Sequence, residues 1–510
     1  MIRGLFSIYA LFVAALILSL SMQPRRVSAG TNGAIFTSAD SAVAGFQTIH
    51  NDFYWVDDKG ARIQTRSGCL RQFNGKFYWY GGTNGFRDQT CYTSTDMVHW
   101  TNKGIVLHLD IDANRMDVLF NDSTKQYVMF MKYNGNGAHL AFATSPTPDG
   151  QFKFISQTLV DNALMGDMSV YEDDDGKAYL AYVSWAIGTN RQHGIYRFSP
   201  DYLSLDKRMF LWNIGGREAP HIFKRNNIYY YGTSKTAGIQ SSGTSYYTAT
   251  HLEGPWSPAK PLPTPGSNNS WESQVDFVIP IQGSQGTIYM FAGDRWLKNQ
   301  GHQGDYVWLP MEFDGDAPTC NFYQDWDFNL SAGTWRPFDP SRNLARGKPA
   351  AASSVAGTNI AGNVTAPTTY ENYTNSKWQS APSDPQSITV DLGAATEINR
   401  VILKWDNTCA KSFKIQVSTD ASNWTDVFST TQGAPYSVTD ETFKTTTARY
   451  VRMLGTERGR ARMGRGGRGG YGGGFGGRGT TLPGAMTPPP ATQPAAPSGY
   501  SLFSFQVLKD

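Results

Sequence analysis

The chain has 510 residues and a formal net charge of only +3, so its charge alone indicates no class of partner. Aromatic residues make up 13% of the chain and charged residues 17%, which favours a β-rich protein with aromatic side chains available to sugars over a helical one. A plain β-rich core also accounts for this composition. The length allows two or three domains.

The first residues have the pattern of a signal peptide. Arg3 precedes the apolar run "LFSIYALFVAALILSL", and small residues at Val27 to Ala29 offer a cleavage site before Gly30. We therefore expect a signal peptide at 1–29 and a secreted, periplasmic or extracellular protein. An uncleaved anchor is the alternative.

Export would place the four cysteines in an oxidising compartment. Cys69 and Cys91 lie in neighbouring predicted strands and are candidates for a disulfide. Cys320 and Cys409 are far apart in the sequence and are expected to be free. No cysteine spacing resembles a zinc site, and the sequence predicts no metal in the catalytic centre.

In the domain predicted at residues 30–335, the region from about 60 to 335 repeats a pattern of strand, polar turn and strand. Turns such as "NG" and "DDDG" are hairpin signals, and a further strand with aromatic residues follows each hairpin. A period of roughly 50 residues is typical of propeller blades, so we predict an all-β fold that begins with a five-bladed β-propeller around a central channel. The repeats fall at residues 68–82, 116–133, 168–184, 219–234 and 275–294.

A second pattern follows a linker at 336–345. From there to residue 510, the stretches "SITVDLGAATEINRVILKWD", "KSFKIQVSTDASNWTDV" and "ARYVRMLGT" alternate as strands do, which predicts a smaller β-sandwich at 346–510. The Gly/Arg/Pro-rich segment at about 458–498 cannot bury enough apolar surface to offset its ordering entropy. We predict that it is a disordered insertion, because "YSLFSFQVL" after it resumes the alternation.

Polar side chains recur at the start of the first strand of each repeat. Innermost strands of a propeller converge on the mouth of its channel, so we expect most of these side chains to meet there. Any single one of them is also explained as an ordinary loop residue. The five positions are Ser67, Arg115, Asp167, Glu218 and Gln274.

Glu218 is the candidate proton donor of this cluster. Glycoside cleavage needs an acid that protonates the leaving oxygen and, in an inverting enzyme, a group across the sugar that activates water. Partial burial and a nearby like charge help an acid to keep its proton near neutral pH. Asp167 from the adjacent repeat can supply that charge and orient Glu218.

The stretches "GDMSVYEDDDGKAYLAY" and "REAPHIFKRNNIYYYGTS" resemble glycoside hydrolase family 43 over about residues 45–335. The resemblance implies a five-bladed propeller with Glu218 as the general acid and Asp167 as the carboxylate that orients the acid and raises its pKa. The first repeat reads "RSGC" where most members carry an aspartate base. The exo-β-1,3-galactanase branch also lacks that base, and "ESQVDFVIPI" is similar to its glutamine stretch. This implies that Gln274 holds the attacking water, as an amide or as an imidic tautomer in a relay.

Substrate contacts are expected around the acid. Aromatic rings can stack on pyranose faces, and charged groups can bind hydroxyls, although each aromatic is also explained as blade core. Two departures from the branch bear on specificity: Gly82 and Asn114 stand where it has acids, with Asp117 as the candidate replacement. The predicted substrate-binding residues are Trp79, Tyr80, Arg115, Asp117, Asp294, Arg295, Trp296 and Trp308.

The second domain is similar to the discoidin, or factor V/VIII C-type, module, on stretches such as "SKWQS", "SITVDLG" and "GYSLFSFQV". The resemblance implies a carbohydrate ligand and, in many such modules, a structural Ca²⁺ bound by oxygen ligands. The loop "TYENYTNSKW" lacks the usual "DGN", which argues against calcium here. The segment "RGRARMGRGGRGGYGGGFGGRG" also resembles RNA-binding segments, but export argues against a nucleic-acid partner.

Together these features predict a secreted, monomeric glycosidase that needs no cofactor for catalysis. The expected reaction is exo-acting, inverting hydrolysis of β-1,3-galactan or a related galactose-containing polysaccharide. Two alternatives stay open: arabinofuranosidase or xylosidase specificity, and a non-catalytic carbohydrate-binding protein that has lost its catalytic base.

Overall fold

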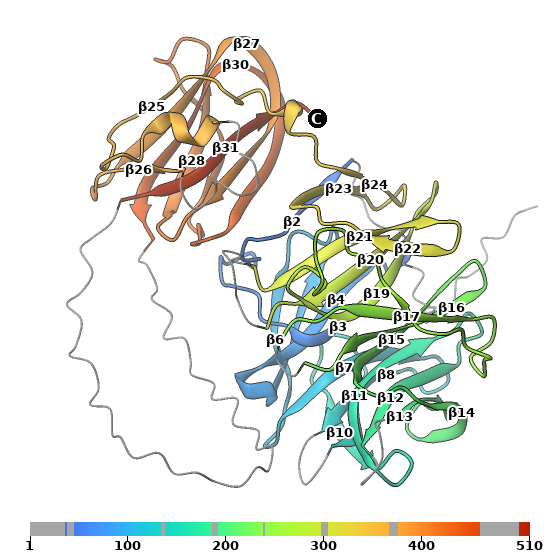
Figure 1. Ribbon diagram of the computed structural model, residues 1–510. Helices are drawn as coiled ribbons and strands as arrows, with labels where there is room; N and C mark the ends of the chain where they lie inside the picture. The colour runs from blue at the N-terminus through green and yellow to red at the C-terminus, as the bar shows by residue number, and fades with distance from the viewer. Residues whose placement is uncertain are drawn as a thin grey trace, which may run out of the picture.

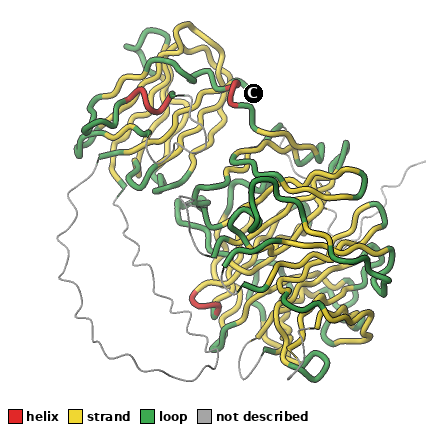
Figure 2. The backbone as a smooth tube through the Cα atoms, in the orientation of Figure 1, coloured by secondary structure: helices red, strands yellow, loops and turns green. Residues whose placement is uncertain are grey.

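The computed structural model describes residues 36–37, 45–133, 138–185, 192–237, 240–296, 304–366, 376–459 and 499–510. Within these ranges the fold is all-β, as predicted, and helix is confined to three short 3₁₀ segments (Figure 2). These are η1 (Asn84–Phe86), η2 (Pro340–Arg342) and η3 (Ala361–Thr365). The described part contains no helix with the length and apolarity of a membrane span. The predicted signal peptide lies outside the described residues.

A β-propeller forms the larger domain, and a smaller β-sandwich lies beside it (Figure 1). The five predicted repeats each form a sheet of consecutive antiparallel strands. The first four are β3–β6 (Arg66–Phe73, Lys76–Thr83, Asp88–Ser94, Thr101–His108), β7–β10 (Ala113–Asn121, Gln126–Tyr133, His139–Ser145, Lys153–Thr158), β11–β14 (Leu164–Glu172, Ala178–Trp185, Gln192–Phe198, Leu205–Asn213) and β15–β18 (Arg217–Arg225, Ile228–Lys235, Thr244–Ala249, Lys260–Pro261). The fifth is β19–β22 (Gln274–Gln282, Thr287–Asp294, Tyr306–Asp314, Ala317–Cys320), to which β1 (Phe36–Thr37) adds in parallel.

The prediction of a five-bladed propeller was wrong, because the described residues of this domain form six sheets. The sixth has three strands, β2 (Gln47–His50), β23 (Asp325–Asn329) and β24 (Thr334–Pro337). Its strands come from the two ends of the domain, with Gln47 opposite Phe328. The repeat pattern did not reveal this sheet, because its paired strands β2 and β23 are separated by the sequence of all five repeats.

The first strands of the five repeats surround the channel. β3, β7, β11, β15 and β19 neighbour one another in that order, and β19 neighbours β3 again. Tight hairpins join each of them to the second strand. The turn between β15 and β16, for example, has Asn226 and Asn227 at φ 51° and 60°, a left-handed conformation that asparagine tolerates. Polar turns read from the sequence therefore fix the register of the strands that carry the site.

The smaller domain is built on one curved seven-stranded sheet with the order β26-β31-β27-β30-β28-β29, in which β25 also pairs with β27. Its core contains the buried indoles of Trp378 and Trp405. Residues 460–498, most of the predicted insertion, lie outside the described residues, and the chain resumes as a strand that pairs with β27. The strands are β25 (Ala350–Ala352), β26 (Trp378–Gln379), β27 (Gln386–Trp405), β28 (Ala410–Ser418), β29 (Thr425–Thr430), β30 (Val438–Arg458) and β31 (Ser501–Leu508).

All four cysteines are free and buried, so the candidate Cys69–Cys91 disulfide does not form. Cys69 lies opposite Tyr80, and Tyr80 lies opposite Cys91, so a whole strand, β4, separates the two thiols. Two strand spacings amount to about 9.5 Å, beyond the reach of a disulfide. Cys320 and Cys409 are free, as expected.

Candidate active site

Each of the five innermost strands contains a β-bulge near its start. The register shifts lie between Arg66 and Cys69, Asn114 and Asp117, Met165 and Met168, Glu218 and His221, and Val275 and Phe277. A bulge bends its strand and re-aims the side chains around it, and bulges are common beside active sites. The predicted residues are therefore not strictly equivalent in register, but four of them still meet at one point.

Arg115 is the centre of this cluster. Its guanidinium donates to Gln274 Oε1 at 2.7 Å, to Asp167 Oδ2 at 3.1 Å and to Asp276 Oδ1 at 2.7 Å. The side chain is 7% exposed. A buried cation of this kind is stable only with such partners, so Arg115 fixes the positions of three strands, β7, β11 and β19, relative to one another.

The amide of Gln274 has a defined orientation. Arg115 Nη2 and the indole Nε1 of Trp296, at 3.1 Å, are both donors, so the atom that they approach must be the oxygen. Nε2 then donates to Glu218 Oε1 at 2.9 Å and to Ser234 Oγ at 3.3 Å. Because Oε1 already accepts two N–H groups, the geometry disfavours the imidic tautomer, which would carry a proton on that oxygen. Gln274 can hold water or substrate but is a poor base.

Glu218 lies within β15 rather than before it, and it is half-buried. Its Oε1 accepts from Gln274 Nε2 and from the backbone N–H of Ala237 at 3.2 Å. Two donors at Oε1 leave Oε2 as the oxygen that would carry the proton needed by a general acid.

The carboxyl of Asp167, a further member of the cluster, is ionised. Burial alone would raise the pKa of its carboxyl, but the charges of Arg115 and Lys132, with the backbone N–H of Ala219, outweigh burial and hold the pKa at about 2. The Ala219 N–H donates to Asp167 Oδ2 at 3.1 Å. Asp167 thus anchors the residue that follows Glu218.

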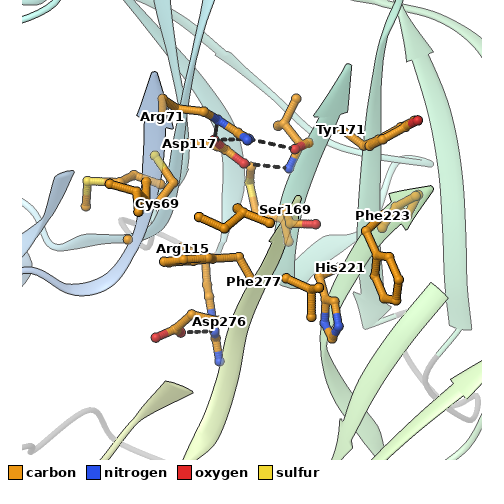
Figure 3. Close-up of a pocket in the computed structure, with 18 of the residues that line it drawn as sticks. Cys69, Arg71, Arg115, Asp117, Ser169, Tyr171, His221, Phe223, Asp276 and Phe277 are labelled. Atoms are coloured by element: carbon orange, nitrogen blue, oxygen red, sulfur yellow. Dashed lines mark hydrogen bonds and ion pairs between the residues drawn. The ribbon is translucent and has the colours of Figure 1, made fainter. Parts of the chain in front are cut away.

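Sequence reasoning missed Asp276, the bulge residue of β19. Burial and the charge of Asp294 raise the pKa of Asp276, against the opposing charge of Arg115, and the pKa of Asp294 is also raised by burial. Figure 3 shows Asp276 paired with Arg115, which donates to Asp276 Oδ1. The available signal was a carboxylate inside the apolar strand "QVDFVIPI".

Below this cluster the channel is nearly filled. A cavity of about 30 Å³ runs between the five innermost strands, enough for one or two waters but not for a sugar. Arg71 and Asp117 close it further along, where Figure 3 shows them paired. Asp117 Oδ1 accepts from Arg71 Nε at 2.8 Å, and Oδ2 accepts from the Val170 N–H at 3.0 Å. The expected sugar contact by Asp117 is therefore corrected to a structural pairing.

Four other expected substrate contacts are also corrected. Trp79, Tyr80 and Trp308 are 2%, 0% and 1% exposed and belong to the hydrophobic cores, so they present no face to a sugar. Arg295 is 1% exposed and donates to Asp52 Oδ1 at 2.7 Å, so it is committed to the interior. Aromatic residues in strands serve blade packing as readily as sugar binding, and their sequence pattern does not separate the two.

Two of the residues expected at the site, Trp296 and Asp294, do lie at the cluster. Trp296 is half-buried, donates to Gln274, and carries Arg66 over its ring at 5.7 Å. Asp294 Oδ2 accepts from the Ser67 N–H at 2.7 Å, which ties β20 to the bulge of β3. Asp294 is 2% exposed, so its expected contact with a sugar is corrected to a supporting contact within the protein.

Gly82 stands where the exo-β-1,3-galactanase branch has a glutamate, and the structure leaves no room for that side chain. A Cβ atom at this position would lie 2.4 Å from Cδ1 of Phe86, so the ring of Phe86 occupies the space in which a glutamate side chain would start. Asn114 has a buried Oδ1 with no hydrogen-bond partner in the described part of the chain. No group of three or more potential metal ligands occurs among the described residues, and most of the loop considered for calcium lies outside them.

Comparison with known proteins places this geometry in a class. Residues 69–291 match the model for glycosyl hydrolases family 43, and residues 363–453 match that for the NedA-like, galactose-binding domain of the F5/F8 type C group. The propeller domain thus matches the glycosyl hydrolases of family 43, a family of glycosidases, and a match to a galactose-binding type of domain follows it. Both resemblances inferred from the sequence are confirmed.

Individual relatives are more distant. A β-D-galactofuranosidase of Aspergillus niger is 25% identical over 230 residues, 40% of this chain, and the match spans 63% of that protein's length. An exo-β-1,3-galactanase from Phanerochaete chrysosporium, solved with β-1,3-galactotriose, is 21% identical at a TM-score of 0.53, over 90% of this chain and 100% of that one. An exo-β-1,3-galactanase from Clostridium thermocellum is 23% identical at a TM-score of 0.53, and the match covers 80% of this chain and 97% of that one. The two structures support the fold alone.

Proposed function

We propose that this glycosidase removes galactose units from the ends of β-1,3-galactan or a related galactose-containing polysaccharide, with inversion. The observation that carries the proposal is the cluster of Glu218, Asp167, Gln274 and Arg115 on four neighbouring innermost strands. The glutamine in place of a first-repeat carboxylate is the feature similar to the exo-β-1,3-galactanase branch. The galactose-binding type of the second domain and the names of the relatives agree with galactose as the sugar.

In the proposed reaction, Glu218 gives the proton on Oε2 to the leaving glycosidic oxygen. Water held by the Gln274 amide attacks the anomeric carbon from the opposite face as the glycosidic C–O bond breaks, and the proton that this water loses passes to bulk solvent. Arg115 and Trp296 fix the amide through its oxygen. Asp167 stays ionised and holds the backbone beside Glu218. No metal or cofactor is needed for these steps.

The substrate has to separate two side chains before this can happen. An inverting enzyme needs room for a sugar and a water between the groups on its two faces, and Glu218 Oε1 lies only 2.9 Å from Gln274 Nε2. This direct contact favours the second candidate function, carbohydrate binding without turnover, if the two side chains stay together.

Product analysis separates the two candidates. Purified protein is incubated with β-1,3-galactan, and the first anomer released is followed by proton NMR. We expect α-galactose to appear before its β-anomer, and Glu218→Gln to release almost none. Binding of galactan by the wild-type protein without any released sugar would establish the non-catalytic function. Release of arabinose or xylose from a panel of polysaccharides would instead support arabinofuranosidase or xylosidase specificity.

The remaining properties belong to the same proposal. The leader-like segment at 1–29 supports export, and no described feature calls for a second copy of the chain, so we propose a secreted monomer. The Gly/Arg-rich segment lies mostly outside the described residues. We propose that it does not bind nucleic acid.

A further inference from the structure

Asp305 lies beside the active site but takes no part in the proposed reaction. It directly precedes β21, it is 4% exposed, and its carboxylate accepts from two arginines. Arg66 Nη2 donates to Oδ1 at 3.0 Å, and Arg62 Nε donates to Oδ2 at 2.5 Å. A buried carboxylate is stable only with such partners, so Asp305 holds both guanidinium groups at one point.

Arg66, the first residue of β3, connects Asp305 to Trp296. Its Nη1 donates to the Trp296 carbonyl at 3.5 Å, and its guanidinium lies 5.7 Å from the centre of the indole ring, whose face attracts a cation. Both contacts come from one guanidinium group, and Asp305 holds the other nitrogen of that group. The grip of Arg66 on Trp296 therefore depends on Asp305.

The main chain reinforces the same connection. The Arg295 N–H donates to the Asp305 carbonyl at 2.8 Å, which places Asp305 beside the residue that precedes Trp296. The Thr65 N–H donates to Tyr306 Oη at 2.8 Å, so the starts of β3 and β21 are joined as well. The start of β3, the end of β20 and the start of β21 therefore meet at Asp305.

The indole of Trp296 extends this connection to the reacting groups. Its Nε1 donates to Gln274 Oε1 at 3.1 Å, and Gln274 Nε2 donates to Glu218 Oε1 at 2.9 Å. The direction of the Gln274 amide, and with it the place where a water can be held, depends on where the indole lies. Asp305 is linked to that amide through Arg66 and Trp296 in turn.

The negative charge of Asp305 is what keeps the two arginines together. Arg62 and Arg66 share this one carboxylate, so their guanidinium groups lie close together and repel each other. Arg62 is also held from outside, because its guanidinium lies 3.6 Å from the centre of the Tyr54 ring. With a neutral side chain at position 305, Arg66 would move away from Arg62, and its contacts with Trp296 would weaken.

We propose that Asp305 is a positioning residue for hydrolysis, which holds Trp296 against the Gln274 amide through Arg66. This role needs no contact between Asp305 and the sugar or the attacking water. The effect on catalysis rests on the proposed function, but the placement of the indole does not. Asp305 thus fixes the direction of the amide from a buried position outside the cluster.

The catalytic test is a double-mutant cycle in the full-length protein, with kcat and KM measured on β-1,3-galactan. Asp305→Asn keeps the size of the side chain but removes its charge, and kcat should fall roughly tenfold with little change in KM. Trp296→Phe removes the indole N–H and should also lower kcat. The double variant should be no slower than Trp296→Phe alone, because Asp305 acts through the indole. Losses that multiply in the double variant would overturn the proposal.

A second measurement does not depend on catalysis. In protein labelled with ¹⁵N-tryptophan, the indole N–H signal of Trp296 is identified by its loss in Trp296→Phe. Hydrogen exchange at this N–H should become about three- to tenfold faster in Asp305→Asn. Arg66→Met, which removes the guanidinium and leaves Asp305 in place, should have the same effect. Unchanged exchange in both variants would overturn the proposal.

Asp173→Asn is the matched control. Asp173 is also buried, and it accepts from Lys224 Nζ at 3.0 Å, but it follows β11 at the end away from Asp167. The control should leave both kcat and the exchange of the Trp296 indole unchanged. A melting temperature measured for each variant checks folding.

The two measurements separate this proposal from the proposed function. Faster exchange in Asp305→Asn, in a protein that releases no sugar from galactan, would support the placement of the indole and overturn the hydrolysis. Wild-type kcat in Asp305→Asn, in a protein that hydrolyses galactan, would overturn the positioning role and leave the function standing.

Discussion

At the scale of single residues, Gln274 decides how the site works. Its oxygen is occupied by Arg115 and Trp296, and its amide nitrogen faces Glu218. The relay through an imidic tautomer that the sequence left open is therefore disfavoured by the contacts. Gln274 is better suited to position water than to take its proton.

Gln274→Glu should shift the pH dependence upward. The new carboxylate would keep Arg115 and Trp296 as donors but place a negative charge beside Glu218, and a like charge nearby raises the pKa of an acid. The alkaline limb of the kcat/KM profile, which reports loss of the proton from the acid, should move up by about one pH unit or more.

The measurement is kcat/KM for β-1,3-galactan across pH 4–9 in both proteins. Gln282→Glu, at the exposed far end of the same strand, is the matched control and should leave the profile unchanged. An unchanged or lower alkaline limb in Gln274→Glu would contradict the placement of Glu218 beside Gln274.

At the scale of elements, the bulges of the innermost strands bring the site together. Glu218 and His221 flank the bulge of β15, and His221 lies opposite Gly232 on β16. A Cβ atom at Gly232 would be 2.1 Å from His221 Nε2, so the position has room only for glycine.

Gly232→Ala should therefore displace β15 and its bulge. Overpacking of this kind costs about 1–3 kcal/mol in the free energy of unfolding, and a shift of Glu218 by a fraction of an ångström should lower kcat severalfold or more. Urea unfolding and initial rates measure the two effects. Gly362→Ala is the control, since nothing lies within 4 Å of its added Cβ atom. Equal stability and rate in the two variants would show that β15 is not constrained at this point.

Much of this element-level organisation could be predicted, because polar turns and alternating strands are local signals. The hairpins, the change of domain and the residues Glu218, Asp167, Gln274 and Arg115 followed from them. The sixth sheet could not, since β2 pairs with a strand some 275 residues away. The burial of four expected contacts could not be predicted either: Trp79, Tyr80, Trp308 and Arg295. The sequence pattern of a blade is the same whether an aromatic or charged side chain faces the core or the sugar.

At the scale of the whole molecule, ion pairs join the domains. Asp325 of the propeller accepts from Lys404 of the sandwich at 2.5 Å and from His50 at 2.7 Å, and Lys404 is fully buried. Burial alone would raise the pKa of Asp325, but the charges of Lys404 and His50 hold it at about 2. The union of the domains therefore depends on an ionised Asp325.

Acid should weaken that union. Because the folded-state pKa of Asp325 is below its ordinary value of 3.8, its contribution is present above pH 3.8 and is lost as pH falls toward 2. This loss is about 2 kcal/mol. The first unfolding transition in urea, followed from pH 5 to pH 2, should become less stable with acid by that amount more in the wild type than in Asp325→Asn. Parallel pH profiles would contradict this account of the junction.

The central claim is that Glu218 donates the proton to the leaving sugar oxygen, and Glu218→Gln tests it with two substrates. On β-1,3-galactan, whose leaving group needs that proton, we expect kcat to fall by about 10²–10⁴. On a dinitrophenyl β-galactoside, whose leaving group departs unprotonated, the fall should be far smaller. Near-wild-type turnover of galactan by Glu218→Gln, or an equal loss on both substrates, would contradict the claim.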